Sequence, residues 1–182
     1  MAYIPLLLAA AVVAWFVVAY NKLVRLRNQV KNAWHQIEVQ LKRRYDLIPN
    51  LVEVVKDYMS YEQETLTRVI EARGAALSAK GAAAQAKAEN ALTESLKSLF
   101  AVVENYPELK ANQNVASLQE ELAATENKIS FARQFYNDSV MTFNNAIQSI
   151  PSNLVASFFN FAQEAYFETE EASRAVPKAD LR

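Results

Sequence analysis

The sequence has no cysteine, two glycines among 182 residues and one histidine, His35. Without cysteine, disulfides, thiol nucleophiles, cysteine-ligated metals and lipidated cysteine anchors are all excluded. A single histidine cannot build the zinc sites that use two or three histidines, and it suggests no serine triad. Two glycines leave no glycine-rich phosphate loop. We therefore expect a protein that is not an enzyme, with no catalytic residue, no metal, no cofactor and no small-molecule substrate.

Net charge is also lacking. Nineteen Lys and Arg residues face 20 Asp and Glu residues, which gives a formal charge of −1. Nucleic-acid-binding domains usually carry a strong basic excess on one face. The balance of charges therefore argues against a nucleic-acid partner.

What the sequence does have is a long apolar run. Residues 1–20 contain no charged side chain, and the next eleven contain four basic residues and no acidic one: Lys22, Arg25, Arg27 and Lys31. At ~1.5 Å per residue, a helix over residues 2–20 spans roughly the ~30 Å hydrocarbon core of a bilayer. The basic flank places the C-terminal body in the cytoplasm and a short N-terminus outside. The same basic residues should attract anionic membrane lipid.

A cleaved signal peptide is the competing interpretation of this run. Such a peptide needs basic residues before a shorter apolar core and a small-residue cleavage site after it. Here no Lys or Arg comes first, and the alanines at 9–11 lie inside the run. We therefore predict an uncleaved anchor over residues 1–21.

The rest of the chain reads as all-α, because its long segments are rich in helix formers and no strand alternation is present. We expect a cytoplasmic helical bundle over 22–167, with a membrane-proximal stalk at 22–45 and a flexible charged tail at 168–182. Its first helix should continue to Arg73, with a kink or a restart capped by Asp46 at Pro49. A return helix over 76–103, a third helix from an Asn114 cap to Pro151 and a short aromatic helix over 154–167 should follow.

The third helix and the stalk both carry apolar stripes. From Val115 to Ile150, apolar residues recur at the alternating spacing of three and four that is typical of coiled coils. On the stalk the stripe is Leu23, Leu26, Val30, Trp34, Ile37 and Leu41. The return helix is too short to cover it, so a cover must come from the aromatic helix or from the stalks of other copies. The aromatic helix would dock with Phe158, Phe159, Phe161, Tyr166 and Phe167. We expect partial cover by this helix together with self-association into a homo-oligomer.

Two polar sets interrupt these stripes. Arg44 lies on the stripe of the first helix and is either solvated or buried against Glu126, Asp138 or Glu62. On the third helix, the polar residues beside the seam are Arg133, Asn137 and Asn144. Polar residues at such positions fix register and partner choice in helical bundles. We expect all four residues to provide structural specificity.

Four segments resemble the LemA family of bacterial membrane proteins. They are YNKLVRLRNQVKNAWHQIEVQLKRRYDLIPNLVEVVKDY at 20–58, EARGA at 71–75, YPELKANQNVASLQEELAATENKISFARQFYNDSV at 106–140 and FNNAIQSIPSNLVA at 143–156. The resemblance implies a single transmembrane helix in the bacterial inner membrane, an outward N-terminus and a cytoplasmic antiparallel helical bundle. It carries over no catalytic residue.

From these features we expect a non-enzymatic, membrane-anchored helical scaffold that self-associates and organises membrane or partner proteins at the cytoplasmic face. The alternative is an adaptor module that binds another membrane protein, such as a membrane protease or an envelope-stress protein, through the aromatic helix.

Overall fold

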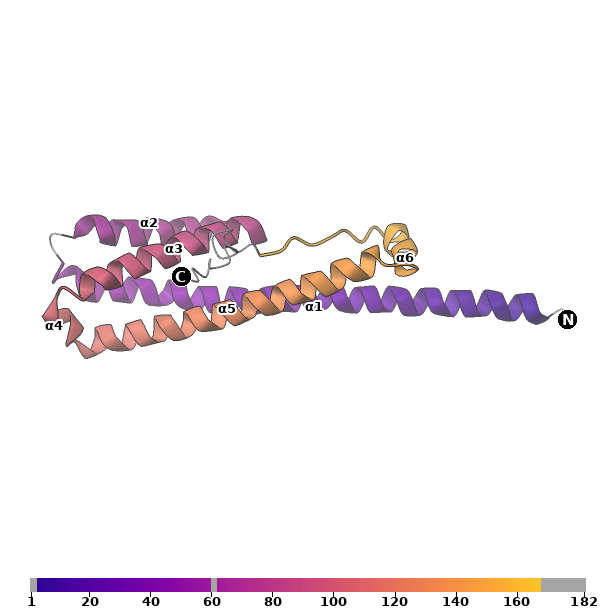
Figure 1. Ribbon diagram of the computed structural model, residues 1–182, viewed down its shortest axis with the longest axis horizontal. Helices are drawn as coiled ribbons and strands as arrows, with labels where there is room; N and C mark the ends of the chain where they lie inside the picture. Colours follow the sequence, from indigo (N-terminus) through magenta and orange to yellow (C-terminus); the bar gives the residue numbers. More distant parts are fainter. Residues whose placement is uncertain (1–2, 60–61, 168–182) are drawn as a thin grey trace, which may run out of the picture. The chain divides into compact units, whose positions relative to one another are not determined.

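The computed structural model describes residues 3–59 and 62–167. Over these residues the regular structure is helical, without a strand. The helices are α1 (Tyr3–Lys56), α2 (Gln63–Ser78), α3 (Ala82–Val103), α4 (Pro107–Lys110), α5 (Gln113–Gln148) and α6 (Ser152–Phe158), as Figure 1 shows. The predicted all-α class is confirmed. The tail predicted at 168–182 lies outside the described residues.

The chain divides into two compact units. The anchor unit comprises Met1–Glu38 with Phe131–Tyr166, and the bundle unit comprises Val39–Ser130 with Phe167–Arg182. Helices α1 and α5 each contribute to both units. In the anchor unit they run antiparallel, since the ring of Trp34 lies 5.4 Å from that of Tyr136 and Ala19 shares a cavity wall with Ala146 further along.

Helix α1 continues through Pro49 without a break, so the predicted restart with Asp46 as a cap is wrong. A proline has no N–H, and the carbonyl four residues earlier, that of Tyr45, loses its intrahelical donor. Arg73 of α2 supplies a replacement, because its Nε donates to the Tyr45 carbonyl oxygen at 2.8 Å. The interruption in the backbone ladder is therefore satisfied from a neighbouring helix of the same unit.

The first helix ends at Lys56, not at Arg73 as predicted. The N–H groups of Tyr58 and Met59 both bond to the Val55 carbonyl, at 3.1 and 3.0 Å, which closes the last turn. Met59 is fully buried at this corner. No glycine or proline marks the end of α1. The apolar spacing of α1 continues into α2 in the sequence, so the break depends on the burial of Met59.

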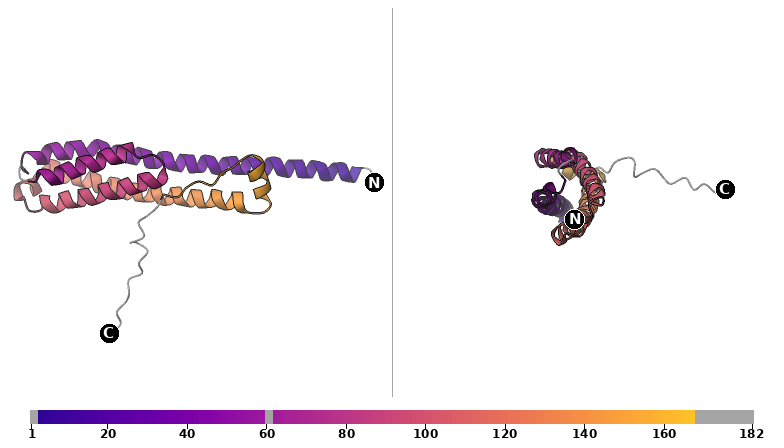
Figure 2. Two further views of the ribbon diagram at one scale, coloured as in Figure 1. Left: turned by 90° about the horizontal axis from the view of Figure 1, so that it is seen from above. Right: turned by 90° about the vertical axis from the view of Figure 1, so that its left-hand side faces the viewer.

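Helices α2 and α3 form a hairpin in the bundle unit and lie side by side in Figures 1 and 2. Helix α2 continues past Gly74 to Ser78, and the reversal falls at Gly81, whose φ of 84° is a conformation that favours glycine. The turn is therefore seven residues beyond the glycine where we expected the first helix to end.

Helix α5 follows the predicted seam closely. Its N-cap is Asn112, whose Oδ1 accepts from the N–H groups of Asn114 and Val115 at 2.9 and 3.4 Å, so the Asn114 cap is off by two residues. The buried seam residues are Val115, Leu122, Thr125, Ile129, Ala132, Tyr136, Ser139 and Phe143. Ile150, the last predicted seam residue, is exposed because α5 ends at Gln148.

The aromatic helix is shorter than predicted, since α6 ends at Phe158 rather than Phe167. Asn160 adopts a left-handed φ of 54°. The Asn160 N–H bonds to the Ser157 carbonyl at 3.3 Å and the Phe161 N–H bonds to the Ala156 carbonyl at 2.9 Å. This pair of bonds around a left-handed residue is the Schellman motif, which terminates a helix. Residues 161–167 consequently continue in a non-helical conformation.

Candidate membrane anchor and buried polar cluster

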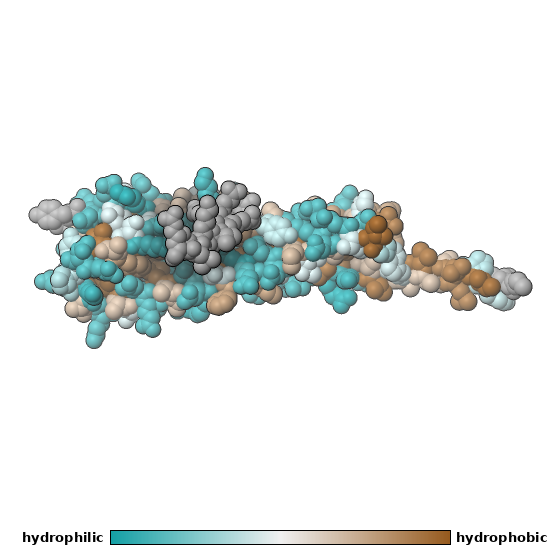
Figure 3. Space-filling view, viewed as in Figure 1, coloured by the Kyte–Doolittle hydropathy of each residue, from teal (hydrophilic) through white to brown (hydrophobic). Residues whose placement is uncertain are grey.

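The N-terminal part of α1 exposes a continuous apolar surface. By length and composition α1 is able to cross a membrane, and 6 % of its most apolar 18-residue window is buried within the structure. The core helix of a soluble domain would have most of such a window covered. Figure 3 shows this part of α1 as an apolar extension of the anchor unit. An exposed apolar helix of this length is consistent with a membrane span.

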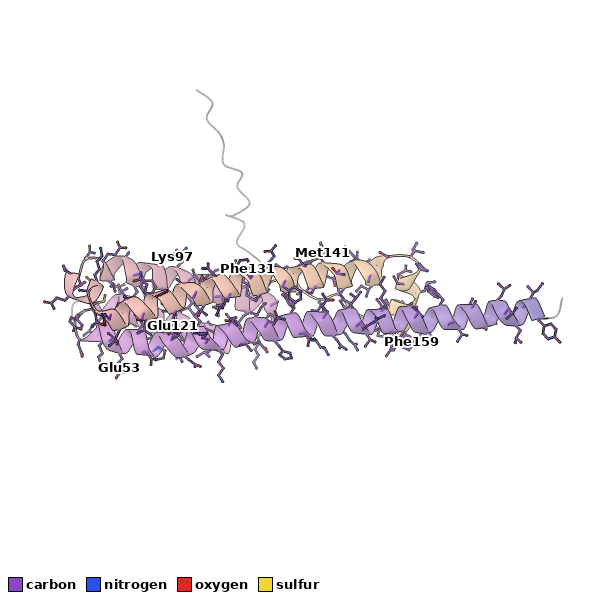
Figure 4. The ribbon with its side chains drawn as sticks, turned by 90° about the horizontal axis from the view of Figure 1, so that it is seen from below. Glu53, Lys97, Glu121, Phe131, Met141 and Phe159 are labelled. Carbon is purple, nitrogen blue, oxygen red and sulfur yellow. The ribbon has the colours of Figure 1, made fainter. Side chains whose placement is uncertain are left out.

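The aromatic residues of α6 pack on this helix within the same chain. The ring of Phe16 lies 5.9 Å from that of Phe158 and 6.0 Å from that of Phe159, and the Phe159 and Tyr20 rings are 4.5 Å apart. Figure 4 shows Phe159 beside α1. These contacts need Phe16 and Tyr20, which a cleaved signal peptide would remove. Retention of the anchor, which these contacts require, stays a prediction.

The four basic residues follow directly along α1. Lys22, Arg25 and Lys31 are exposed, whereas Arg27 is half-buried. The Arg27 guanidinium lies 5.0 Å from the ring centroid of Phe161, within cation–π range. Three of the four are thus open to lipid headgroups, and the fourth helps to hold the segment that follows α6.

The stalk stripe is covered by the chain itself. Leu23, Val30, Ile37 and Leu41 are buried, and Leu26 and Trp34 are half-buried. In the anchor unit α5 lies against this stripe, since the Trp34 and Tyr136 rings are 5.4 Å apart and Leu23 lines a cavity with Ala146. The segment after α6 adds Phe161, whose ring lies beside Arg27. Cover within the chain is one of the two covers that the sequence predicted, and a contribution from other copies stays a prediction.

Polar residues of α5 hold residues 164 and 165, which follow α6, in place. The Asn144 side chain donates to the Glu164 carbonyl at 2.9 Å and accepts from the Glu164 N–H at 3.0 Å. The Tyr136 hydroxyl donates to the Ala165 carbonyl at 2.9 Å. Arg133 and Asn137 are half-buried on the same helix. Asn144 therefore fixes the backbone of Glu164, and Tyr136 fixes the backbone of Ala165.

Arg44 forms the centre of a buried polar cluster in the bundle unit. Its side chain is 3 % exposed, and Nη1 lies 2.8 Å from a carboxylate oxygen of Glu126 on α5 and 3.3 Å from one of Glu89 on α3. Its Nη2 donates to the Thr93 hydroxyl at 2.8 Å. Of the three partners named from the sequence, Glu126 is right, while Asp138 and Glu62 are replaced by Glu89.

Glu89 is held from a second side by Tyr45 and Gln85. The Tyr45 hydroxyl donates to Glu89 Oε1, and the Gln85 amide nitrogen lies 3.0 Å from the same oxygen and 2.9 Å from the Tyr45 hydroxyl. Gln85 Nε2 also lies 3.1 Å from the Ala76 carbonyl of α2. The cluster thus links α1, α2, α3 and α5 through the Arg44 guanidinium, the carboxylates of Glu89 and Glu126, and the Gln85 amide.

Burial controls the acid–base behaviour of this cluster. Desolvation raises the pKa of Glu89 above its ordinary value, against the lowering effects of the Tyr45 hydrogen bond and of the Arg44 charge. Desolvation and the Glu89 carboxylate raise the pKa of Tyr45, so that its hydroxyl stays protonated and remains a donor. In the folded chain the Tyr45 hydroxyl therefore keeps its proton and its hydrogen bond to Glu89.

Sequence reasoning missed Glu89 and Gln85, although a signal for them exists. The buried apolar positions of α3, Leu92, Leu96 and Leu99, follow a spacing of four and three. Extending this spacing toward the N-terminus reaches Glu89 and Gln85. Two polar residues at core positions of an alanine-rich helix therefore indicate a buried network.

A small cavity lies beside the cluster. A cavity of about 190 Å³ adjoins Arg44, Thr93 and Glu126. Cavities that bind small molecules usually measure ~300–1,000 Å³. In the described part of the chain no three His, Asp or Glu residues come together as a metal-binding group. His35 is exposed and lies 2.8 Å from Glu38. The geometry of the cluster is that of a structural link.

Comparison with known proteins agrees with this anchor and bundle. The sequence model described as the LemA family matches residues 33–181. The chain is similar to Protein LemA of Metamycoplasma hominis, with 26% identity over 164 residues that cover 89% of this chain and 75% of the relative. It is also similar to Magnetosome protein MamQ 2 and Magnetosome protein MamQ 1 of Paramagnetospirillum magneticum, each 24% identical over 195 residues that cover 93% of this chain and 72% of the relative.

Proposed function

The chain belongs to the LemA family, and from this membership and the geometry of its anchor we propose that it is a non-enzymatic scaffold of the bacterial inner membrane. Its relatives and its exposed apolar helix are consistent with a membrane-associated helical protein. In this proposal α1 crosses the membrane, its N-terminus faces outward and the bundle unit works in the cytoplasm. The scaffold organises membrane or partner proteins there.

One observation carries the proposal. Helix α1, Tyr3–Lys56, is a single helix that is apolar and exposed at its start, and its later residues carry a buried face in each unit. Residues of the anchor unit and of the bundle unit therefore belong to one helix. A helical protein tethered to the membrane in this way is suited to organise other proteins there.

The surface offered to partners must be reassigned, because the stalk stripe is buried. Helix α5 exposes Phe131, 73 % accessible, and Phe135, 41 % accessible, one turn apart in the anchor unit (Figure 4). Two exposed phenylalanines on one helix face are the kind of apolar surface that marks a protein contact. We place the contact between copies here and name it the Phe131–Phe135 face.

The adaptor alternative uses the same surface with a different occupant. Of the aromatic residues first assigned to docking, Phe159 and Phe161 pack on Tyr20, whereas Phe158 is 72 % exposed. Because part of this set is engaged within the chain, we propose that a foreign membrane protein would bind the Phe131–Phe135 face. The protein bound at the Phe131–Phe135 face, either a second copy or a foreign protein, distinguishes the scaffold from the adaptor.

Site-specific photo-crosslinking in intact cells tests the face. A photoreactive amino acid at Phe131 or Phe135 should capture a second copy, giving a product near twice 20.5 kDa. Met141 is the matched control, since it is exposed on the same helix but points about 80° away from Phe131 and about 120° away from Phe135 around the helix axis. Capture of a foreign protein alone would favour the adaptor, and no capture above the Met141 control would contradict both proposals.

A further inference from the structure

The corner between α5 and α6 carries exposed apolar residues at the level of the membrane anchor. Ile150 is 85 % exposed, Leu154 is 64 % exposed and Phe158 is 72 % exposed. Leu154 and Phe158, four residues apart, lie on one face of α6, while Val155 and Ala156 are buried on the other side, and Ile150 lies in the turn that precedes α6. A soluble surface would not ordinarily gather three such residues. We name residues 149–159 the α6 corner.

The depth of this corner follows from its contacts with α1. Phe158 and Phe159 pack on Phe16, four residues before Tyr20 and therefore ~6 Å further along the helix. The apolar residues 3–20 measure ~27 Å, close to the ~30 Å thickness of a hydrocarbon core. If Tyr20 lies at the edge of that core, the α6 corner lies inside it. Short interfacial helices bury their apolar face ~5–10 Å below the headgroup boundary, which is the same depth.

The charge pattern fits this position. Between Asp138 and Glu164 the sequence has no Asp, Glu, Lys or Arg. The first charged group next to the corner is Lys22, which lines a cavity of about 340 Å³ together with Trp15, Val18, Ile150 and Pro151. The cavity is lined by α1 residues at the end of the apolar run and by the α6 corner, and Lys22 is its one charged lining residue. Figure 3 shows apolar surface over both α6 and the N-terminal part of α1.

We propose that the α6 corner is a second membrane contact, which inserts Ile150, Leu154 and Phe158 into the leaflet on the bundle side and meets lipid acyl chains there. This inference rests on the anchoring role proposed for α1 and adds a second point of attachment. The two contacts together restrict rotation of the anchor unit about α1, because a single helix alone is free to rotate in a bilayer.

Lipid quenching in reconstituted vesicles tests this contact. The natural chain has no cysteine, so a single Leu154→Cys variant of the full chain can carry an environment-sensitive fluorophore. In vesicles of phosphatidylcholine and phosphatidylglycerol, spin-labelled lipid should quench this fluorophore strongly and aqueous iodide should not. His35→Cys is the matched control, since the His35 side chain is 72 % exposed in the same unit and lies ~22 Å beyond Tyr20 along α1. Its fluorophore should show the reverse.

Two further outcomes would overturn the inference. A Leu154 fluorophore quenched by iodide but not by lipid would place the corner in water. Protection from both quenchers would mean that another protein, such as a second copy, covers it. A fluorophore at Val12→Cys reports separately on α1, so that a failure of the anchor is distinguished from a failure of the corner. A Leu154→Asp/Phe158→Asp variant should keep its helicity, because both side chains are exposed, while a fluorophore at Ile150→Cys loses its lipid quenching.

Discussion

Replacing Arg44 by Ala should lower the free energy of unfolding of the bundle unit by about 3–5 kcal/mol, the usual cost of removing one partner of a buried ion pair. The loss arises because Glu89, which is 1 % exposed, keeps its carboxylate and loses the guanidinium beside it. The thermal midpoint of the circular dichroism signal, measured on the full chain in mild detergent, should fall accordingly.

Arg43→Ala provides the matched control for this prediction. Arg43 is the neighbouring residue, and its pair with Glu121, at 3.4 Å, is half exposed on both sides. Exposed pairs contribute about 0–1 kcal/mol, so the control midpoint should hardly move. Equal midpoints for Arg44→Ala and Arg43→Ala would show that the cluster does not stabilise the fold.

The Arg44→Ala defect should also depend on pH. The pKa of Glu89 is raised in the fold by burial. A raised pKa means that the stability contribution of the group is present below its ordinary pKa and is lost as pH rises through the folded value. Removing Arg44 takes away a lowering influence and raises the pKa further. The difference in stability between wild type and Arg44→Ala should therefore be smaller at acid pH than at neutral pH.

Ile37→Asp should destabilise the anchor unit by at least about 4 kcal/mol, since it removes a fully buried aliphatic side chain and buries a carboxylate. Ile37 is 0 % exposed on the stalk stripe. If the stripe is covered within the chain, this variant should lose helicity and unfold at a markedly lower temperature. The measurement is the same thermal midpoint in mild detergent.

Val39→Asp is the control for Ile37→Asp, because Val39 lies two residues further on and is 64 % exposed. Its midpoint should stay close to that of the wild type. If Ile37→Asp instead kept its midpoint and only broke an oligomer into smaller species, the stripe would be an interface between copies, and its cover within the chain would be incorrect.

Much of the helical architecture could be predicted from periodicity. The α5 seam repeats regularly because each of its residues packs on the same side, so Val115, Ile129 and Phe143 are identifiable from spacing alone. The aliphatic residues of the stalk stripe are predictable for the same reason. Periodicity reports which side of a helix is covered. It does not report what covers it, and the self-association expected from the stripe had no independent support.

The corners and the polar cluster were harder to predict for physical reasons. The break after Lys56 has no glycine or proline and is made by burial of Met59, a tertiary contact. Pro49 is accommodated because Arg73, 24 residues later, supplies the missing donor. Likewise, Glu89 is acceptable in a core only because Arg44 and Tyr45 reach it from another helix. Each of these depends on a partner distant in sequence, and one chain shows no covariation that would identify the pair.

The central claim, that α1 crosses the membrane and places the bundle in the cytoplasm, is tested most directly by cysteine accessibility in intact cells. Glu53→Cys introduces one exposed thiol late in α1 (Figure 4), and Tyr3→Cys introduces one at its start. A membrane-impermeant maleimide should label Tyr3→Cys in cells whose inner membrane is sealed, and should label Glu53→Cys only after that membrane is permeabilised. Labelling of Glu53→Cys in sealed cells would contradict the proposed orientation, and recovery of the protein in the soluble fraction would contradict the anchor itself.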